Sequence, residues 1–190
     1  MTSKYPVKKI LFIGEESTNL REILIRYVKD RYTEGYFNKN YFNFKFKGYE
    51  IIVEEQEIEL NLWELSTSEK SAREKSLAYL DCNVVILCFD RYNLESLKKI
   101  TKKWHDEVGK ICGNIPCVLV GIRNRSDVDR EKVMMNETIL DIDIKIAMKS
   151  VKSREYSECD LGITKVKELM EGIIFLAKFP DEKNGKCCLQ

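Results

Sequence analysis

The sequence predicts an α/β domain in which a mostly parallel, doubly wound sheet is covered by helices on both faces. Three near-continuous apolar runs support this, at residues 10–13, 82–90 and 116–122. Such runs are typical of central parallel strands that are buried on both sides. Segments with apolar residues at helical spacing lie between the runs, one of them after Asn93, which we expect to cap a helix. Strands that alternate with helices in this way form a single layered domain.

The composition suits one domain with a sizeable core, since 44% of the 190 residues are hydrophobic. The 32 basic and 31 acidic residues nearly cancel, so the charge gives no indication of a nucleic-acid surface. Seven cysteines without a C-x-x-C pair indicate a reducing compartment instead of a disulfide framework or zinc site. No apolar run approaches the roughly 20 residues of a membrane span, and the N-terminal residues contain no apolar signal region. We therefore expect a cytoplasmic protein.

In the first half of the chain, a helix should begin near Ser17 or Thr18 and fade near Asp30. Residues 44–53 and 57–63 should be two strands of a hairpin, because the second alternates apolar and polar residues and the connection is short. A charged segment after them should lead into a helix.

In the second half, residues 140–151 allow two interpretations. Leu140, Ile142, Ile144 and Ile146 alternate as in a strand, whereas Ile144, Ala147, Met148 and Val151 are spaced as in a helix. A helix from Asp143 is favoured, because a covering helix is needed before the short strand at residues 155–159. A last helix should span residues 163–178, so that residues 1–179 form the domain and residues 180–190 a flexible tail.

The segment after the first strand has the layout of a phosphate-binding loop, in which a strand ends at Gly14 and a helix follows. A working loop reads G-x-x-x-x-G-K-[ST], where Gly allows close backbone approach, Lys opposes the phosphate charge and the hydroxyl holds Mg²⁺. Those three positions are here Asn19, Leu20 and Arg21. Two glutamates also follow Gly14, and each would repel a phosphate about 4 Å away by roughly 1–4 kcal/mol. The layout is present, but its chemistry is not.

This order of elements resembles the Ras superfamily of small GTPases, and its details resemble the Rho family. The most specific match is to the pattern W-x-x-E-V…C-x-N-x-P…L-V-G, at Trp104, Glu107, Val108, Cys112, Asn114, Pro116, Leu119, Val120 and Gly121. Leu62 and Trp63 match the pair before the second switch, and the long segment between the Gly121 strand and Cys159 resembles a slightly shortened Rho insert. The resemblance implies a small-GTPase fold with a mostly parallel six-stranded sheet.

The metal-binding and hydrolytic positions of the family are altered in this chain. Lys39 stands where the resemblance places the Mg²⁺-binding Thr of the first switch. The D-x-x-G motif of the second switch begins with Glu64 and ends with Thr67, and Ser68 replaces the Gln that orients the attacking water.

The base-reading positions are altered as well. The N-K-x-D motif begins with Ile122 and ends with Arg125, so the carboxylate that would pair with guanine is missing. The last base-contacting motif, S-A-K, begins here with Asp160. Since the phosphate, metal and base positions all depart together, ordinary Mg²⁺-GTP binding is not expected.

The resemblance therefore predicts a Rho-like pseudo-GTPase, a signalling protein that acts through protein contacts. The alternative is an atypical Rho GTPase that binds GTP or GDP weakly and hydrolyses it slowly or not at all. No cofactor is expected; if one binds, it should be GTP or GDP with Mg²⁺. By analogy, effectors or regulators of Rho signalling should contact Tyr36, Asn43 and Phe44 on a monomeric protein.

The last four residues, from Cys187 to Gln190, form a C-a-a-X box, and a terminal Gln favours a farnesyl group on Cys187. One lipid gives only marginal anchoring, and Lys183 and Lys186 are the only bases near it. We therefore expect reversible attachment to the cytoplasmic face of a membrane.

Overall fold

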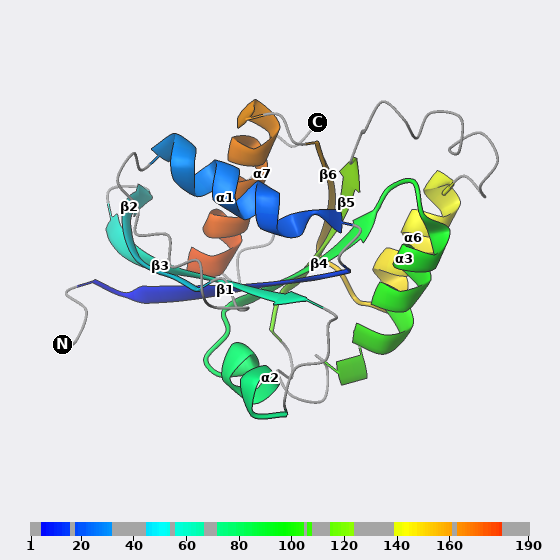
Figure 1. Cartoon of the computed structure of the whole chain (residues 1–190), viewed down its shortest axis with the longest axis horizontal. Coiled ribbons are helices and arrows are strands. Elements are labelled where there is room, and N and C mark those ends of the chain that lie inside the picture. Colours follow the sequence, from blue (N-terminus) through cyan, green and yellow to red (C-terminus); the bar gives the residue numbers. More distant parts are fainter. Residues whose placement is uncertain are drawn as a thin grey trace.

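The computed structural model describes residues 5–15, 18–31, 45–53, 56–66, 72–104, 106–107, 115–123, 139–160 and 163–179. Within them lies a six-stranded sheet with the strand order β2-β3-β1-β4-β5-β6 (Figure 1). The strands are β1 (Val7–Gly14), β2 (Lys45–Val53), β3 (Gln56–Ser66), β4 (Val84–Asp90), β5 (Cys117–Arg123) and β6 (Glu155–Asp160). The β2–β3 hairpin is antiparallel and the remaining pairs are parallel, which confirms the predicted sheet.

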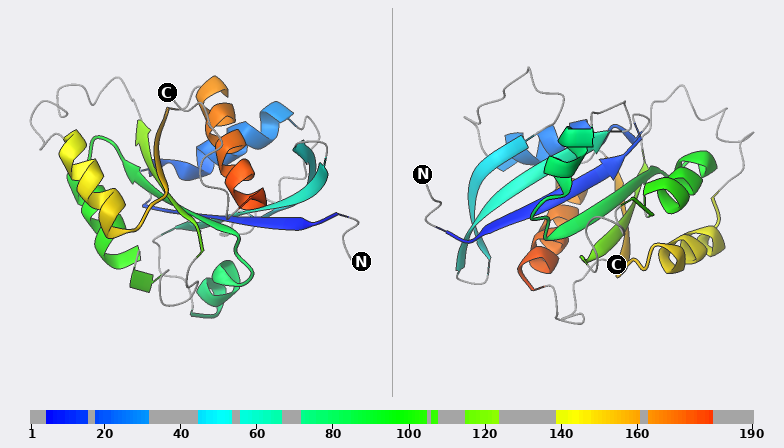
Figure 2. Two further views of the ribbon diagram at one scale, coloured as in Figure 1. Left: turned by 180° about the vertical axis from the view of Figure 1, so that it is seen from behind. Right: turned by 90° about the horizontal axis from the view of Figure 1, so that it is seen from below.

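Helices cover both faces of this sheet (Figures 1 and 2). They are α1 (Leu20–Arg31), α2 (Ala72–Tyr79), α3 (Leu94–Lys99), α6 (Asp141–Ser150) and α7 (Ile163–Lys178), and α3 continues as a π-helical turn, Ile100–Trp104. The helices α1 and α7 pack on one face, and α2, α3 and α6 pack on the other. In the described part of the chain, no helix combines the length and apolar character needed to cross a membrane.

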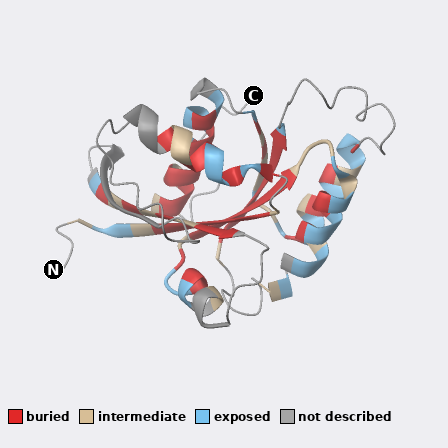
Figure 3. Cartoon of the chain, in the orientation of Figure 1, coloured by how far each residue is buried: buried red, intermediate tan, exposed pale blue. Residues whose placement is uncertain are grey.

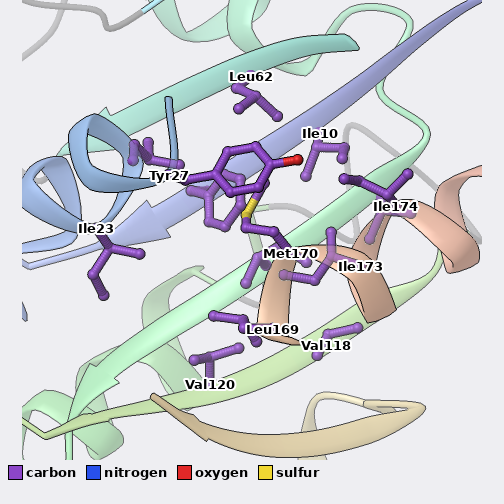
Figure 4. Packing of buried hydrophobic residues seen from close by; sticks show 14 of the residues in the cluster. Ile10, Ile23, Tyr27, Leu62, Val118, Val120, Leu169, Met170, Ile173 and Ile174 are labelled. Atoms are coloured by element: carbon purple, nitrogen blue, oxygen red, sulfur yellow. The ribbon is translucent and has the colours of Figure 1, made fainter. Parts of the chain in front are cut away.

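Two buried clusters, one on each face of the sheet, form the core (Figure 3). In the first, Ile23 and Tyr27 of α1 meet Met170 and Ile173 of α7 above the central strands (Figure 4). The strands β1, β4 and β5 contribute to both clusters because successive side chains point to opposite faces. This explains why their sequences are apolar throughout instead of alternating.

Residues 141–150 are helical, as favoured from the sequence. Ile144, Ala147 and Val151 are buried, whereas Ile142 is 57% exposed, so the helical spacing and not the strand-like alternation marks the inner face. The helix starts at Asp141, two residues before the predicted position.

Other predicted boundaries agree closely with the structure. Asn93 caps α3 as expected, since its side chain accepts hydrogen bonds from the backbone N–H groups of Glu95 and Ser96. The last helix has the predicted limits, Ile163–Lys178. The second strand of the hairpin continues to Ser66, beyond the predicted end at residue 63. The tail at residues 180–190 and residues 124–138 of the insert-like segment lie outside the described residues.

The cysteines inside the described ranges are core residues. Cys82, Cys88, Cys117 and Cys159 are buried and form no disulfide. Burial raises the pKa of the Cys117 thiol to about 12, so this group stays protonated and unreactive near neutral pH.

Candidate nucleotide-binding site

The candidate site begins where β1 ends, at Gly14. A Cβ atom on this residue would lie 2.9 Å from Thr18 Oγ1 and 3.3 Å from the Cβ of Cys88 on β4. Thr18 itself is fully buried. Gly14 is therefore required because the loop and the neighbouring strand both approach its backbone closely.

The loop after Gly14 closes on itself through Thr18. Both the backbone N–H and the hydroxyl of Thr18 donate to the carbonyl of Glu15, at 3.0 and 2.6 Å. Asn19 follows with φ 47°, a left-handed conformation that Asn tolerates better than most residues. The turn delays the helix, so α1 begins at Leu20 and not at the predicted Ser17 or Thr18. It also uses a loop N–H that a phosphate cradle would direct at its ligand.

The side chain of Glu15 is paired within the protein. Its Oε2 lies 2.9 Å from Nζ of Lys99 on α3, and the Glu15 side chain is only 16% exposed. The hydrogen bond and the negative charge of Glu15 raise the pKa of the Lys99 ammonium. From the sequence, this carboxylate was only a negative charge that would repel a phosphate. In the fold, its ion pair with Lys99 also connects the loop to α3.

Leu20 occupies the position of the phosphate-binding Lys and points into the core. It is 4% exposed and belongs to the cluster that contains Ile10, Phe12 and Leu24. An aliphatic side chain in this cluster supplies no charge to a ligand, and the position is already filled by apolar packing.

Arg21 and Glu64 are brought together from different elements. Arg21 lies in the first turn of α1, and Glu64 lies near the end of β3, beside Phe12 of β1. The Nε of Arg21 is 3.7 Å from Oε2 of Glu64. Glu64 is only 7% exposed, so this ion pair is partly shielded from water. The two residues stand where the resemblance places two groups that bind Mg²⁺, a hydroxyl and a carboxylate.

The base-reading end of the site contains an ionic cluster around Glu158 of β6. Arg91 Nε donates to Glu158 Oε1 at 2.9 Å, and the Tyr156 hydroxyl donates to the same oxygen at 2.7 Å. Arg123, at the end of β5, pairs with the other carboxylate oxygen. Ile122 beside it is fully buried in the core. The predicted positions Ile122 and Asp160 therefore lie at adjacent strand ends, but their surroundings are ion pairs and apolar packing.

The charge of Glu158 predicts a pH-dependent contribution to stability. Burial opposes ionisation, but hydrogen bonds from Tyr156 and Arg91 and the charge of Arg123 lower the net pKa of this carboxyl below its ordinary value of 4.5. Its stabilising effect is thus complete above the unfolded-state pKa and is lost as the pH falls through the lower folded-state pKa. We expect the stability difference between the wild type and Glu158→Gln to shrink from pH 6 to pH 3 in urea denaturation. A constant difference would contradict this assignment, and the exposed Glu22→Gln serves as control.

A second ionic anchor holds α2 against the sheet. Lys9 of β1 is 8% exposed, and its ammonium donates to the carbonyls of Leu77 and Leu80 at 2.7 and 2.6 Å. The same ammonium lies 4.0 Å from the ring centroid of Trp63. A cation at the last carbonyls of a helix also interacts favourably with the helix dipole.

Glu107 adds a further contact to this helix. It accepts a hydrogen bond from the Tyr79 hydroxyl at 3.2 Å and pairs with Lys75 at 3.3 Å. Together with Lys9, it fixes α2 through groups that belong to the protein itself.

A magnesium-bound guanine nucleotide does not fit these residues. The phosphate-binding Lys is a buried Leu20, Arg21 brings a positive charge to a metal position, and Glu15 brings a negative charge to the phosphate loop. Across the described ranges, no three His, Cys, Asp or Glu side chains gather to hold a metal ion.

Some of the predicted site residues lie close together, and others lie outside the described residues. Gly14, Asn19, Leu20, Arg21 and Glu64 cluster where β1 and β3 end and α1 begins. The predicted positions outside the described residues are Tyr36, Lys39, Asn43, Phe44, Thr67, Ser68, Arg125 and Cys187.

The sequence interpretation missed the charged groups that organise this end of the fold. Lys9, Lys99 and Glu158 were not singled out, although each is paired in the structure. For Lys9 there was a signal, because a lysine next to the apolar run 10–13 must either leave the sheet or find a buried acceptor.

Comparison with known proteins gives the family. The profile of the Ras family matches residues 9–159, which include the loop and all or most of each described strand. The chain is also 29% identical over 117 residues to "GTP-binding protein rho4" of Schizosaccharomyces pombe. That match covers 57% of this chain and spans 58% of the length of the relative. The chain belongs to the Ras family.

Proposed function

We propose that this chain is a Rho-like pseudo-GTPase that signals through protein contacts instead of a nucleotide switch. The burial of Leu20 is the observation that carries the proposal, because the family's phosphate-binding cation is replaced by a core side chain. The similarity to a yeast protein named as a Rho GTP-binding protein supports the Rho-like part of the proposal.

The proposed partners are protein effectors or regulators of Rho signalling. They would contact residues 36–44 and 66–79, the counterparts of the family's two switch segments. In the second of these segments, α2 exposes Leu77, and Leu80 directly after the helix is also exposed; the two are 49% and 59% accessible. Neighbouring exposed aliphatic side chains are a feature of protein–protein contact surfaces. We propose that the protein is a monomer when no partner is bound and that it binds no nucleic acid.

A released-nucleotide assay tests the proposal. The purified full chain is denatured, and the supernatant is analysed by chromatography for GDP and GTP. We expect far less than one guanine nucleotide per chain. Recovery of about one equivalent would overturn the pseudo-GTPase proposal and support a working switch.

Weak nucleotide binding is the alternative, and one observation favours it. Gly14 is retained, and Asn19 adopts φ 47°, so part of the loop keeps a backbone shape that glycine would otherwise provide. In this alternative, the purified chain is empty but binds added GDP weakly, which the released-nucleotide assay separates from tight binding.

Membrane attachment through a farnesyl group on Cys187 is part of the proposed function. We expect a tagged wild-type chain to divide between membrane and cytoplasmic fractions, because one lipid with two nearby lysines gives reversible attachment. The variant Cys187→Ser should move almost entirely to the soluble fraction. An unchanged membrane share would contradict the lipid attachment, and Cys112→Ser is the matched control.

A further inference from the structure

We propose that the Arg21 guanidinium is a built-in replacement for a bound metal ion, tying the start of α1 to the end of β3 through Glu64. The inference rests on the proposed function, since it concerns the same site. It adds a named device, an internal cation, that makes the site independent of any ligand.

The geometry places the two charges in a shielded position. Glu64 lies on the face of β3 that contributes Leu60 and Leu62 to the core, and its side chain is 10% exposed. Arg21 reaches it from the first turn of α1, with Nε 3.7 Å from Oε2 and 48% of the arginine side chain exposed. One partner is thus almost buried, and the other closes the site toward solvent.

A carboxylate in this environment requires a positive charge. Taking an ionised carboxylate out of water without compensation is strongly unfavourable. Burial is the main cause of the raised pKa of the Cys88 thiol, and the negative charge of Glu64 raises that pKa further. In a metal-dependent site, a divalent ion would balance such a carboxylate. Here the guanidinium of Arg21 balances the carboxylate and, as part of the chain, cannot leave the site as a bound ion can.

The ion pair has a consequence for the segment that follows β3. Residue 66 ends β3 and begins the proposed partner-binding segment, and the other end of that segment, α2, is held by Lys9 and Glu107. Both described ends are therefore held by side chains of this chain. Because these two described ends are held without a nucleotide, we expect partner binding there not to require loading or hydrolysis of a nucleotide.

A double-mutant cycle on the full chain tests the inference by urea denaturation. The variants are Arg21→Met, Glu64→Gln and the double substitution, and the exposed pair Arg26 and Glu22 on the same helix gives the matched cycle. We expect coupling at Arg21 and Glu64 of at least about fivefold in the unfolding equilibrium constant, because the residues interact in a shielded site. The exposed pair should couple by about twofold or less. Arg21→Lys, which keeps the charge, should retain most of the stability.

The outcomes are decisive in both directions. If Arg21→Met is too unstable to fold, a folded double variant still supports the pair, because removal of both charges leaves no unpaired carboxylate. Coupling no larger than in the control pair, or a double variant no more stable than Arg21→Met, would overturn the inference.

Hydrogen exchange gives an independent readout. Protection at residues 64–66 should be the same in EDTA and in MgCl₂ for the wild type, and it should fall in Arg21→Met but not in Arg26→Met. Protection that requires MgCl₂ in the wild type would contradict an internal cation. These measurements can fail while the released-nucleotide assay succeeds, so the inference and the proposed function are tested separately.

Discussion

Replacing Lys9 by methionine lowers the free energy of unfolding by about 2–4 kcal/mol. The substitution keeps the aliphatic stem but removes the ammonium, which is bonded to the Leu77 and Leu80 carbonyls and lies over Trp63. Two helix-end carbonyls then lose their donor in a place where only 8% of Lys9 was exposed. Urea denaturation measures the loss, and hydrogen exchange should show that α2 opens more readily than the sheet.

Lys8→Met is the matched control for this prediction. Lys8 is the preceding residue on β1, so its side chain points to the opposite face and does not reach α2. We expect a change of within about 0.5 kcal/mol for this half-buried lysine. Equal effects of the two substitutions would show that the ammonium of Lys9 does not anchor the helix.

Restoring the family's lysine at position 20 destabilises the protein and does not create a nucleotide site. Leu20→Lys places an ammonium in the apolar cluster around Ile10 and Phe12, and we expect a loss of about 2–5 kcal/mol. The phosphate loop still carries the Glu15–Lys99 pair, and the metal position still carries Arg21. Added Mg²⁺-GDP should therefore not raise the melting temperature of the variant.

Leu20→Met is the control, because it conserves volume and should cost less than about 1.5 kcal/mol. If Leu20→Lys were as stable as Leu20→Met and gained stability from Mg²⁺-GDP, the apolar role assigned to Leu20 would be wrong. The two variants therefore separate packing from charge at one position.

The sheet was predictable because its signals are local and strong. The run 82–90 and the run 116–122 are apolar throughout, and only a strand covered on both faces needs such a composition. The helix at residues 141–150 was recognisable by the spacing of Ile144, Ala147 and Val151. Its exact start was not, because a boundary depends on individual hydrogen bonds such as that from the Leu140 N–H to Asp143.

The site was only partly predictable, because its key contacts join distant segments. The substituted residues at the phosphate and metal positions could each be recognised from the sequence, by comparison with the family's motifs. The pairing of Lys99 with Glu15, 84 positions apart, could not, since nothing in the local sequence indicates that α3 would meet the loop. Likewise, Arg21 and Glu64 each looked like a lost ligand until the fold placed their charges together.

In the proposed pseudo-GTPase, internal ion pairs replace the metal ion and the phosphate as the groups that hold the site. Without a metal ion, the negative charge of Glu64 would have no positive charge to balance it. Without a phosphate, the loop after Gly14 would have no ligand to hold it. The pairs with Arg21 and Lys99 meet those two needs. Membrane attachment at Cys187 and the contacts of residues 36–44 are separate proposals and do not depend on these pairs.

Calorimetric titration of the full chain with Mg²⁺-GTP and Mg²⁺-GDP tests the central claim most directly. The account predicts no saturable heat up to about 1 mM nucleotide, a limit equivalent to less than about 4 kcal/mol of binding free energy. Saturable binding of one nucleotide per chain with a Kd below about 1 mM would contradict this expectation.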